Sequence, residues 1–333
     1  MKILVYLEKS DVRGGIEIFA ERHVARLRAD GHEVKMVSAI DKRQPTAGRQ
    51  SAIDFSAFDE VVVHKCSDVS TLEKFPPEKT VYYVHDHEPI CPRSYAYTPL
   101  KRNCTRPGGV WPCIFCAPLC RNWKSALKRV LSQERRKRAM AGFRKLVVIS
   151  EFMKGRLVAN GIPAEKIVVE APKIESLRVG IGSDRVADST QTLNDPNHAF
   201  VDLLYVGQLI RGKGVQLLLA AMARMKTPRT LDIVGTGNME PKLRALAAQL
   251  GIEGRVRFNG FQSNPQDWMR AAKCVVVPSF WQEPYGLVAA EAVALGRPVV
   301  AFAIGGLPEA CGGKATLVPP GDIAALAAAL ELP

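Results

Sequence analysis

Residues 279–309 read SFWQEPYGLVAAEAVALGRPVVAFAIGGLPE, and this stretch decides the fold class. It follows the apolar run CVVVP at 274–278, which predicts a buried strand. Apolar residues continue from Leu287 until Gly296 and Pro298 end the segment, which predicts a helix with a glycine cap. The run PVVAFA predicts the next strand. A strand, a helix and a second strand in this order are typical of a parallel sheet wrapped by helices.

The same alternation extends through most of the chain on both sides of this stretch. Residues 173–200 lose it and are rich in Gly, Ser, Asp and Pro, so we interpret them as a linker or long loop. We therefore predict an α/β protein of two Rossmann-like doubly wound parallel-sheet domains, 1–172 and 201–333, which face each other across a cleft. The expected strands lie at 2–7, 32–39, 60–64, 80–84, 145–150, 166–172, 201–207, 230–235, 256–261, 274–279 and 298–303.

The composition is that of a globular protein with an excess of positive charge. The chain has 333 residues, 47% of them hydrophobic and 24% charged, and a formal net charge of +13. No stretch approaches the roughly 18 apolar residues that a membrane span needs, and the first residues predict a strand rather than a signal peptide. We therefore expect a cytoplasmic protein whose eight cysteines are reduced or metal-bound rather than paired.

Glu283 and Glu291 stand eight positions apart on either side of Gly286. The first amides of a helix have no partner within it and carry the positive end of its dipole, which suits a phosphate. Gly286 allows the backbone to approach such a ligand closely. Two acids beside a diphosphate can accept hydrogen bonds from the hydroxyls of two sugars. The pattern predicts a site for a nucleoside diphosphate sugar, which carries a hexose at one end and a ribose at the other.

The spacing from Glu283 to Glu291 resembles the E-x7-E signature of the retaining glycosyltransferase family 4 (glycosyl transferases group 1), whose members have the GT-B fold. The resemblance covers almost the whole chain and implies sugar transfer with retention of anomeric configuration. Five further segments resemble the family in the same order along the chain: GGIE at 14–17, VHDHEPICPR at 84–93, VVISEFMKGRLVANGIPAEKIVV at 147–169, YVGQLIRGKGVQLLLAA at 205–221 and LDIVGTGNMEPKLRALAAQLGIEGRVRFNGF at 231–261.

The resemblance implies roles for individual residues of the C-terminal domain. Glu283 would act on the donor sugar as a catalytic residue, Glu291 would contact the ribose, and Lys213 would neutralise the diphosphate. Gln208 stands where the family has an arginine, so Arg211 in the same loop is a second candidate for that charge. The backbone would meet the nucleotide and its phosphates at Gly235, Gly237, Gly286, Leu287 and Val288.

In the N-terminal domain, Gly14 and Gly15 follow the first strand, and His85 follows the strand TVYYV. The glycines form either an ordinary strand-to-helix turn or a backbone surface for donor phosphate or acceptor. A lone histidine is more often structural, but His85 resembles the family's catalytic histidine. We see no carboxylate suited as a nucleophile, so the resemblance implies acceptor attack on the leaving-group face, with the phosphate oxygen taking the proton. This chemistry requires no cofactor.

Residues 91–120 form a cysteine-rich insert on the predicted acceptor side. Cys113 and Cys116 have the spacing of metal ligands, and Cys104 and Cys120 flank them within seventeen residues. The four thiolates are candidates for a structural zinc, with free thiols or disulfides as the alternatives. We expect the insert to shape acceptor choice rather than chemistry.

Twelve Lys or Arg and two Glu lie within residues 121–156, a local charge of +10. Such a segment is either a solvated helix face or a surface for acidic ligands. Together with Trp123, Leu127, Val130 and Leu131, it predicts an amphipathic helix that rests on acidic lipid at the inner membrane face. A nucleic-acid-binding module is the rival class, but the chain contains no motif for reading bases.

We therefore predict a peripheral membrane hexosyltransferase of polysaccharide biosynthesis. It would move a hexose from a nucleoside diphosphate sugar to a hydroxyl of a glycan or lipid-linked acceptor. The alternatives are a sugar-nucleotide epimerase with the GT-B fold and a protein that binds nucleotide sugar without turnover. The resemblance implies further helices beyond the final segment GDIAALAAALELP, so either this sequence is truncated or the C-terminal domain lacks the usual last helices.

Overall fold

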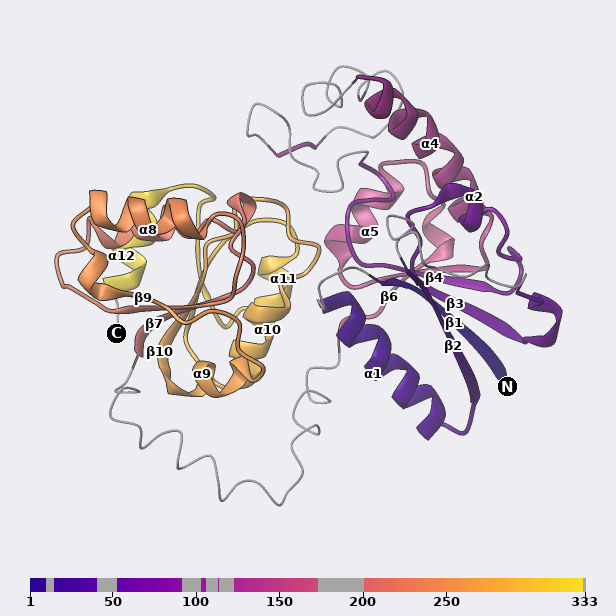
Figure 1. The fold of residues 1–333 in the computed structure, drawn as a ribbon, viewed down its shortest axis with the longest axis horizontal. Helices are drawn as coiled ribbons and strands as arrows, with labels where there is room; N and C mark the ends of the chain where they lie inside the picture. Colours follow the sequence, from indigo (N-terminus) through magenta and orange to yellow (C-terminus); the bar gives the residue numbers. More distant parts are fainter. Residues whose placement is uncertain are drawn as a thin grey trace. The chain divides into compact units, whose positions relative to one another are not determined.

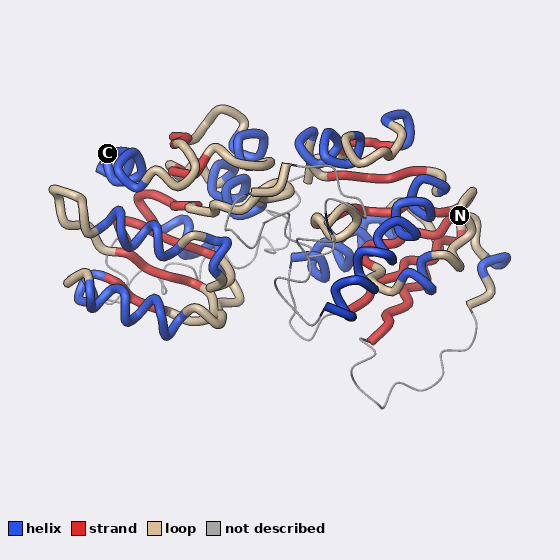
Figure 2. Tube along the Cα trace, turned by 90° about the horizontal axis from the view of Figure 1, so that it is seen from above, coloured by secondary structure: helices blue, strands red, loops and turns tan. Residues whose placement is uncertain are grey.

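The computed structural model describes residues 1–9, 15–40, 53–91, 103–105, 113, 123–172 and 201–331. The chain divides into two compact units, Met1–Ala171 and Pro172–Pro333. Each unit is a parallel sheet with helices on both of its faces (Figure 1 and Figure 2). The predicted linker at 173–200 lies outside the described residues.

The first unit is a six-stranded sheet in the order β2-β1-β3-β4-β5-β6, and all of its strand pairs are parallel. The chain moves from β1 to β2 at one side and then returns to β3 on the other side of β1. Its strands are β1 (Lys2–Lys9), β2 (Glu33–Ile40), β3 (Glu60–Lys65), β4 (Thr80–Val84), β5 (Lys145–Val148) and β6 (Ile167–Val169). Its helices are α1 (Gly15–Ala29), α2 (Val69–Leu72), α4 (Trp123–Gly142) and α5 (Glu151–Val158), with 3-10 turns η1 (Phe55–Ala57) and η3 (Ala164–Lys166).

The central strand β1 is apolar on both faces because both faces are covered. Ile3 and Val5 belong to a buried cluster that includes Val24 of α1. Leu4 and Tyr6, which point to the opposite face, belong to a second cluster with residues of α2, α4 and α5. Figure 1 accordingly shows α1 on the other side of the sheet from these three helices. Continuous apolar strands are the expected consequence of such double cover.

The second unit is a six-stranded parallel sheet in the order β12-β11-β10-β7-β8-β9. The strand order reverses between β7 and β10, and ligands of doubly wound sheets bind beyond the carboxyl ends of the strands at such a switch point. Its strands are β7 (Val201–Val206), β8 (Leu231–Val234), β9 (Val256–Phe258), β10 (Ala272–Val277), β11 (Val299–Phe302) and β12 (Thr316–Val318). Its helices are α7 (Val215–Met222), α8 (Glu240–Gln249), α9 (Pro265–Ala271), α10 (Leu287–Ala294), α11 (Leu307–Cys311) and α12 (Ile323–Glu331), with 3-10 turns η7 (Arg211–Lys213) and η8 (Glu253–Arg255).

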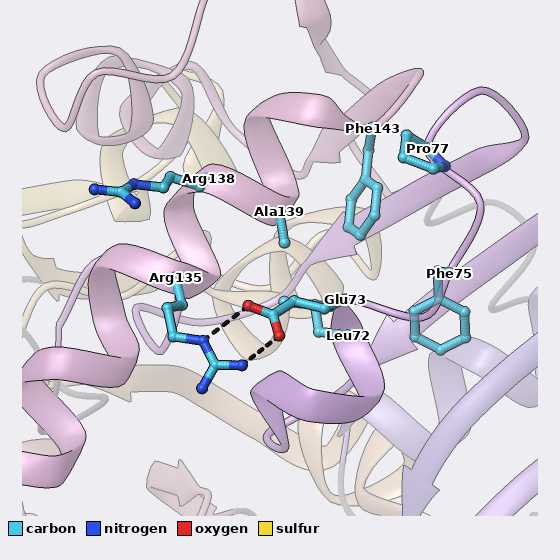
Figure 3. A pocket seen from close by; sticks show the side chains of 8 residues that line it. All are labelled: Leu72, Glu73, Phe75, Pro77, Arg135, Arg138, Ala139 and Phe143. Carbon is cyan, nitrogen blue, oxygen red and sulfur yellow. Dashed lines mark hydrogen bonds and ion pairs between the residues drawn. The ribbon is translucent and has the colours of Figure 1, made fainter.

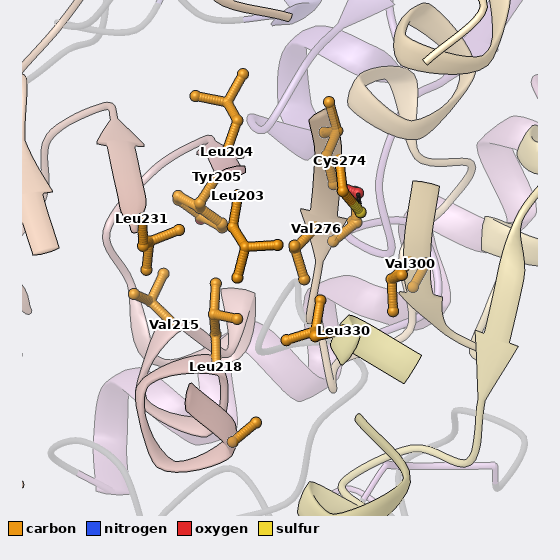
Figure 4. Close-up of a cluster of buried hydrophobic side chains, with 14 of the residues drawn as sticks. Leu203, Leu204, Tyr205, Val215, Leu218, Leu231, Cys274, Val276, Val300 and Leu330 are labelled. Atoms are coloured by element: carbon orange, nitrogen blue, oxygen red, sulfur yellow. Dashed lines mark hydrogen bonds between the residues drawn. The ribbon is translucent and has the colours of Figure 1, made fainter. Parts of the chain in front are cut away.

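The core of the second unit joins its first strand to its last helix. Figure 4 shows Leu203 of β7, Leu218 of α7 and Leu330 of α12 in one buried cluster. The predicted helix α10 and its two flanking strands are confirmed, as is the prediction of two Rossmann-like parallel-sheet domains. The elements α11, β12 and α12 were not predicted from the sequence, and α12 supplies buried leucines to this core.

Gly214 allows the loop after β7 to lie against the loop after β10. It has a φ of 77°, and a Cβ built on it would lie 1.8 Å from the carbonyl oxygen of Pro278. Gly251, with a φ of 66°, has the same handedness but no atom within 4 Å of such a Cβ. The two glycines therefore separate the effect of backbone conformation from that of close packing.

We predict that Gly251→Ala lowers the free energy of unfolding by about 1–2 kcal/mol, the cost of a left-handed alanine. Gly214→Ala should lower it clearly more, because the backbone of two loops must also move apart. Urea denaturation of both variants and the wild type measures the difference. Equal losses in the two variants would show that the close approach at Gly214 does not contribute.

Candidate functional site

An ion pair with a buried carboxylate joins the two loops that flank the switch point of the second unit. Lys213 ends η7, just after β7, and Glu283 lies between β10 and α10. The Lys213 Nζ lies 2.6 Å from the Glu283 Oε1. The Ser279 hydroxyl donates to the same oxygen, also at 2.6 Å. The Glu283 residue is only 6% exposed, so these partners replace the water that the carboxylate would otherwise bind.

The environment of Glu283 favours its charged form. Burial alone would raise the pKa of this carboxyl. The charge of Lys213 and the hydrogen bonds that the carboxylate accepts outweigh burial, and the pKa lies below its ordinary value. At neutral pH the site therefore presents a carboxylate and an ammonium group in direct contact.

Trp281 packs under the same lysine and was not singled out in the sequence. The Lys213 Nζ lies 5.3 Å from the centre of the indole ring, a cation–π distance. A Cβ on Gly212 would lie 3.1 Å from two atoms of this ring, so the glycine allows the loop after β7 to cover it. The Phe280 amide donates to the Gly212 carbonyl at 3.1 Å and closes the contact between the loops.

The predicted anion site is the beginning of α10. Gly286 has a φ of 117°, and Leu287 and Val288 are the first two residues of the helix. The first helical hydrogen bond runs from the Ala290 amide to the Gly286 carbonyl. Glu283 thus lies three residues before the amides that carry the positive end of the helix dipole.

Glu291 lies on the same helix in a different environment. It is partly exposed, and its Oε2 lies 3.3 Å from the Gln266 Nε2 of α9. Glu283, in contrast, is fixed by a cation at 2.6 Å. The two acids therefore flank the start of α10 as predicted, one held firmly and one near the surface.

The other donor-site residues predicted in the second unit lie in neighbouring loops of this sheet edge. Gln208 and Arg211 are exposed in the loop after β7. Gly235 and Gly237 follow β8, and Cβ atoms there would lie 1.9 Å from the Gly207 carbonyl and 2.4 Å from the Leu209 carbonyl. These glycines bring the loops after β7 and β8 together, so the predicted backbone contacts at Gly235 and Gly237 lie beside the loop that carries Lys213.

In the first unit, Gly15 begins α1, while Gly14 lies outside the described residues. His85 follows β4, as predicted, and its Nε2 lies 3.0 Å from the Nδ1 of His64. The Nε2 of His64 lies 3.0 Å from the Nδ1 of His23. His64 and His23 were not identified in the sequence, because their positions on β3 and α1 carry no motif.

Burial controls the charge of this histidine chain. It lowers the pKa of His85 to about 3 and that of His23 to about 4, so both rings are neutral at pH 7. The adjacent Asp86 behaves oppositely, because burial and the nearby Glu88 raise its pKa to about 6. The carboxyl edge of this sheet thus combines neutral imidazoles with a carboxyl that titrates near neutrality.

Only part of the predicted zinc site can be placed. Cys104 and Cys113 are partly exposed, and Cys116 and Cys120 lie outside the described residues. Arg156 of α5 donates to the carbonyls of Cys104 and Thr105 at 3.0 and 2.9 Å, which ties this part of the insert to the first unit. Among the residues that the structure describes, no group of three or more His, Cys, Asp or Glu could hold a metal ion.

A surface cavity of about 490 Å³ lies beside the basic helix α4, and none of the residues predicted for the donor site lines it. Figure 3 shows Arg135 of α4 directed at the carboxylate of Glu73, which accepts two hydrogen bonds from it. The cavity is lined by Leu72, Glu73, Phe75, Pro77, Arg135, Arg138, Ala139 and Phe143.

Within the described parts of the chain, none of the helices is long and apolar enough to cross a bilayer.

Comparison with known proteins identifies the second unit. Residues 201–332 match the family model of glycosyl transferases group 1. Over 179 residues the chain is 40% identical to a D-inositol 3-phosphate glycosyltransferase of Corynebacterium kroppenstedtii, with 49% of this chain and 39% of that protein covered. Over 111 residues it is 40% identical to the uncharacterized glycosyltransferase MJ1607 of Methanocaldococcus jannaschii, with 32% and 28% covered.

Anabaena HepE, solved in complex with UDP, has a similar structure. It matches 99% of this chain and 89% of its own, with a TM-score of 0.67 and 20% identity, a likeness that shows the fold alone. The two parallel-sheet units are those of the GT-B glycosyltransferases. The match of residues 201–332 to the glycosyl transferases group 1 family model confirms, for the second unit, the resemblance found in the sequence. The chain spans 28% and 39% of the two curated relatives named above.

We predict that the histidine chain makes stability depend on pH. The folded protein holds the pKa of His23 at about 4, below its ordinary value of 6.5, so the unfolded chain binds more protons between these values. The contribution of His23 is therefore fully present above pH 6.5 and is lost as pH falls towards 4. His23→Phe should make the free energy of unfolding fall less steeply in this range, as measured by urea denaturation.

A variant of Asp86 is the control, because this residue changes the pH dependence of stability in the opposite direction to His23. Because its pKa is raised to about 6, the folded protein binds more protons there, and the contribution of Asp86 is lost as pH rises through 6. Asp86→Asn should therefore make the fall towards acid pH steeper than in the wild type. Identical pH dependence in both variants and the wild type would contradict the assignment.

Proposed function

We propose that the protein is a retaining glycosyltransferase that moves a hexose from a nucleoside diphosphate sugar to a hydroxyl acceptor in glycan or glycolipid synthesis. The observation that carries the proposal is the Lys213–Glu283 pair, whose carboxylate is buried beside the start of α10, at the switch point of a glycosyl transferases group 1 domain. HepE, solved with UDP and with UDP-glucose, supports a donor of this class.

The donor would lie along the carboxyl edge of the second sheet. The amides of Gly286, Leu287 and Val288 would bind the diphosphate together with the charge of Lys213. Exposed Arg211, in the same loop as Lys213, supplies a second cation. It takes the place of the arginine that the family has at the position of Gln208. No cofactor is proposed for catalysis, because two cations and a helix terminus can stabilise the leaving diphosphate.

The carboxylates would bind the two sugars of the donor. Glu283 would accept hydrogen bonds from the hexose hydroxyls, and Glu291 from the ribose. As the bond to the diphosphate breaks, positive charge develops on the hexose, and a fixed carboxylate nearby stabilises it. The acceptor hydroxyl would attack from the same face, and its proton would pass to the departing phosphate oxygen.

The first unit would contribute His85 and the turn at Gly14 and Gly15 to the acceptor side. The cysteine-rich insert, with Cys104, Cys113, Cys116 and Cys120 as proposed zinc ligands, would shape acceptor choice. The match to a D-inositol 3-phosphate glycosyltransferase supports a hydroxyl acceptor, which is the chemistry that the name of that relative gives.

The basic helix α4 would bring the protein to an acidic membrane on its cytoplasmic side. Lys128, Leu131, Arg135 and Arg138 are exposed and recur every three or four residues, so they share one face of the helix. Cations with an exposed leucine suit a layer of anionic headgroups. This docking would give access to a lipid-linked acceptor.

We predict that Glu283→Gln lowers the rate of sugar transfer by about a hundredfold or more, the effect of removing a fixed group that stabilises transition-state charge. The measurement is release of UDP from UDP-glucose in the presence of a lipid extract or glycan acceptor. Glu253→Gln, an exposed acid on the same unit, is the matched control and should keep wild-type activity. Wild-type transfer by Glu283→Gln would overturn the role of this residue.

The same assay separates the alternatives. A sugar-nucleotide epimerase would change the sugar of the donor when no acceptor is present, and mass-matched sugar standards would reveal the new isomer. A binder without turnover would be stabilised against heat by the donor but would release no UDP. A glycosyltransferase requires the acceptor for product.

If α4 docks on a membrane, binding to anionic vesicles should depend on the positive charge of this helix. Replacing Lys128 and Arg138 by Glu should weaken binding to vesicles of anionic phospholipid by about fivefold or more per residue, from roughly 1 kcal/mol per cation near the surface. Vesicle co-sedimentation over a salt series measures it, and Lys242→Glu on α8 is the control. Equal binding by the wild type and the variant with Lys128 and Arg138 replaced would exclude α4 as the docking surface.

A further inference from the structure

Three histidines from three elements of the first unit form a continuous chain of ring contacts. His23 lies on α1, His64 on β3 and His85 after β4. Both contacts measure 3.0 Å and both join an Nε2 to an Nδ1. His64, at the centre, is 1% exposed and uses both of its ring nitrogens in the chain. A further partner of His85 would therefore have to bind at its Nδ1.

The contacts couple the tautomers of all three rings. A neutral imidazole has one N–H and one lone pair, and each contact needs one of each. If His64 donates from Nδ1 to His85, it must accept at Nε2 from His23. All three rings then carry hydrogen on Nδ1. In the opposite polarity all three carry hydrogen on Nε2, and no mixed arrangement satisfies both contacts.

Aromatic packing fixes the planes of these rings. The centre of the Phe19 ring lies 5.1 Å from that of His85 and 5.7 Å from that of His64. The Tyr83 ring lies 4.7 Å from His64 and 4.9 Å from His23. Such contacts leave the rings little freedom to rotate away from the chain.

The charged groups around the chain lie at its two ends. Glu17 of α1 and Lys65 of β3 act on His85 with opposite sign. Arg26 of α1 and Glu170, which follows β6, act on His23 with opposite sign. Because the two charges at each end oppose each other and burial disfavours a charged ring, the chain is built from neutral imidazoles.

We propose that His64 and His23 are positioning residues that hold His85 in one ring orientation and one tautomer, and so fix whether its Nδ1 offers an N–H or a lone pair to a bound sugar. The inference rests on the proposed function in one respect, which is that His85 contacts the substrate. The shared tautomer is a property of the protein itself and is measurable without turnover.

The first experiment is nitrogen NMR of the full chain labelled with ¹⁵N-histidine at pH 7. The protein has six histidines, and the loss of signals in His23→Phe, His64→Phe and His85→Phe assigns the three rings. We expect one shared tautomer, all Nδ1–H or all Nε2–H. Different tautomers among the three rings would overturn the inference, even if the protein transfers sugar normally.

The second experiment tests positioning. His64→Phe keeps an aromatic ring but removes both contacts, so His85 should show mixed tautomers, and kcat/KM should fall about tenfold or more, as when the partner that sets a tautomer is lost. His64→Asn places an amide near the former Nδ1. This variant should recover part of the single tautomer of His85 and part of the lost kcat/KM. Unchanged tautomer in His64→Phe, or no recovery by His64→Asn, would contradict the inference.

A shared tautomer in a protein that transfers no sugar would instead contradict the proposed function. The two ideas therefore fail on different measurements. Thermal unfolding of each variant confirms that the comparison is made between folded proteins.

Discussion

The charge pair of Lys213 and Glu283 joins two loops at the sheet edge of the second unit, and the carboxylate of this pair is buried. An ionised carboxylate that is 6% exposed is stable only if a cation and hydrogen-bond donors replace its water. Lys213 and Ser279 do this for Glu283, and the pair fixes the loop after β7 to the loop after β10. Because these two strands are neighbours where the strand order reverses, the interaction sets the geometry of the candidate site.

The first unit uses a buried cation in a similar way. Arg136 of α4 is 4% exposed and donates to the carbonyls of Cys66 and Ser67, which follow β3. It also lies 3.6 Å from Glu88, beyond β4. Part of the positive charge counted in the sequence therefore points inwards and holds strand ends together. The exposed charge of α4 is smaller than its composition suggests, and Lys128 and Arg138 are among the cations that remain at the surface.

The sequence predicted those features that depend on local pattern. The apolar runs of β1 and β10, and the glycine that opens α10, have signals within a few residues. The chain of His23, His64 and His85 had no such local signal, because its members lie on different elements and only the fold brings them together. The same holds for Trp281, whose contact with Lys213 depends on two loops that are far apart in the sequence. The strand β12 has only three residues and therefore a weak pattern, whereas the place of α12 is set by its packing onto α7.

Two glutamates that look alike in the sequence differ once their surroundings are known. Glu283 is buried, charged and in contact with a cation, so its geometry is set before any ligand arrives. Glu291 is partly exposed, and it accepts a hydrogen bond of 3.3 Å from the neutral amide of Gln266, which is longer than either contact of Glu283. A fixed charged group is most useful where charge develops in the reaction, and a partly exposed group suffices for binding a remote part of the donor. The physical difference between the two sites therefore agrees with the proposed division, in which Glu283 acts on the hexose and Glu291 on the ribose.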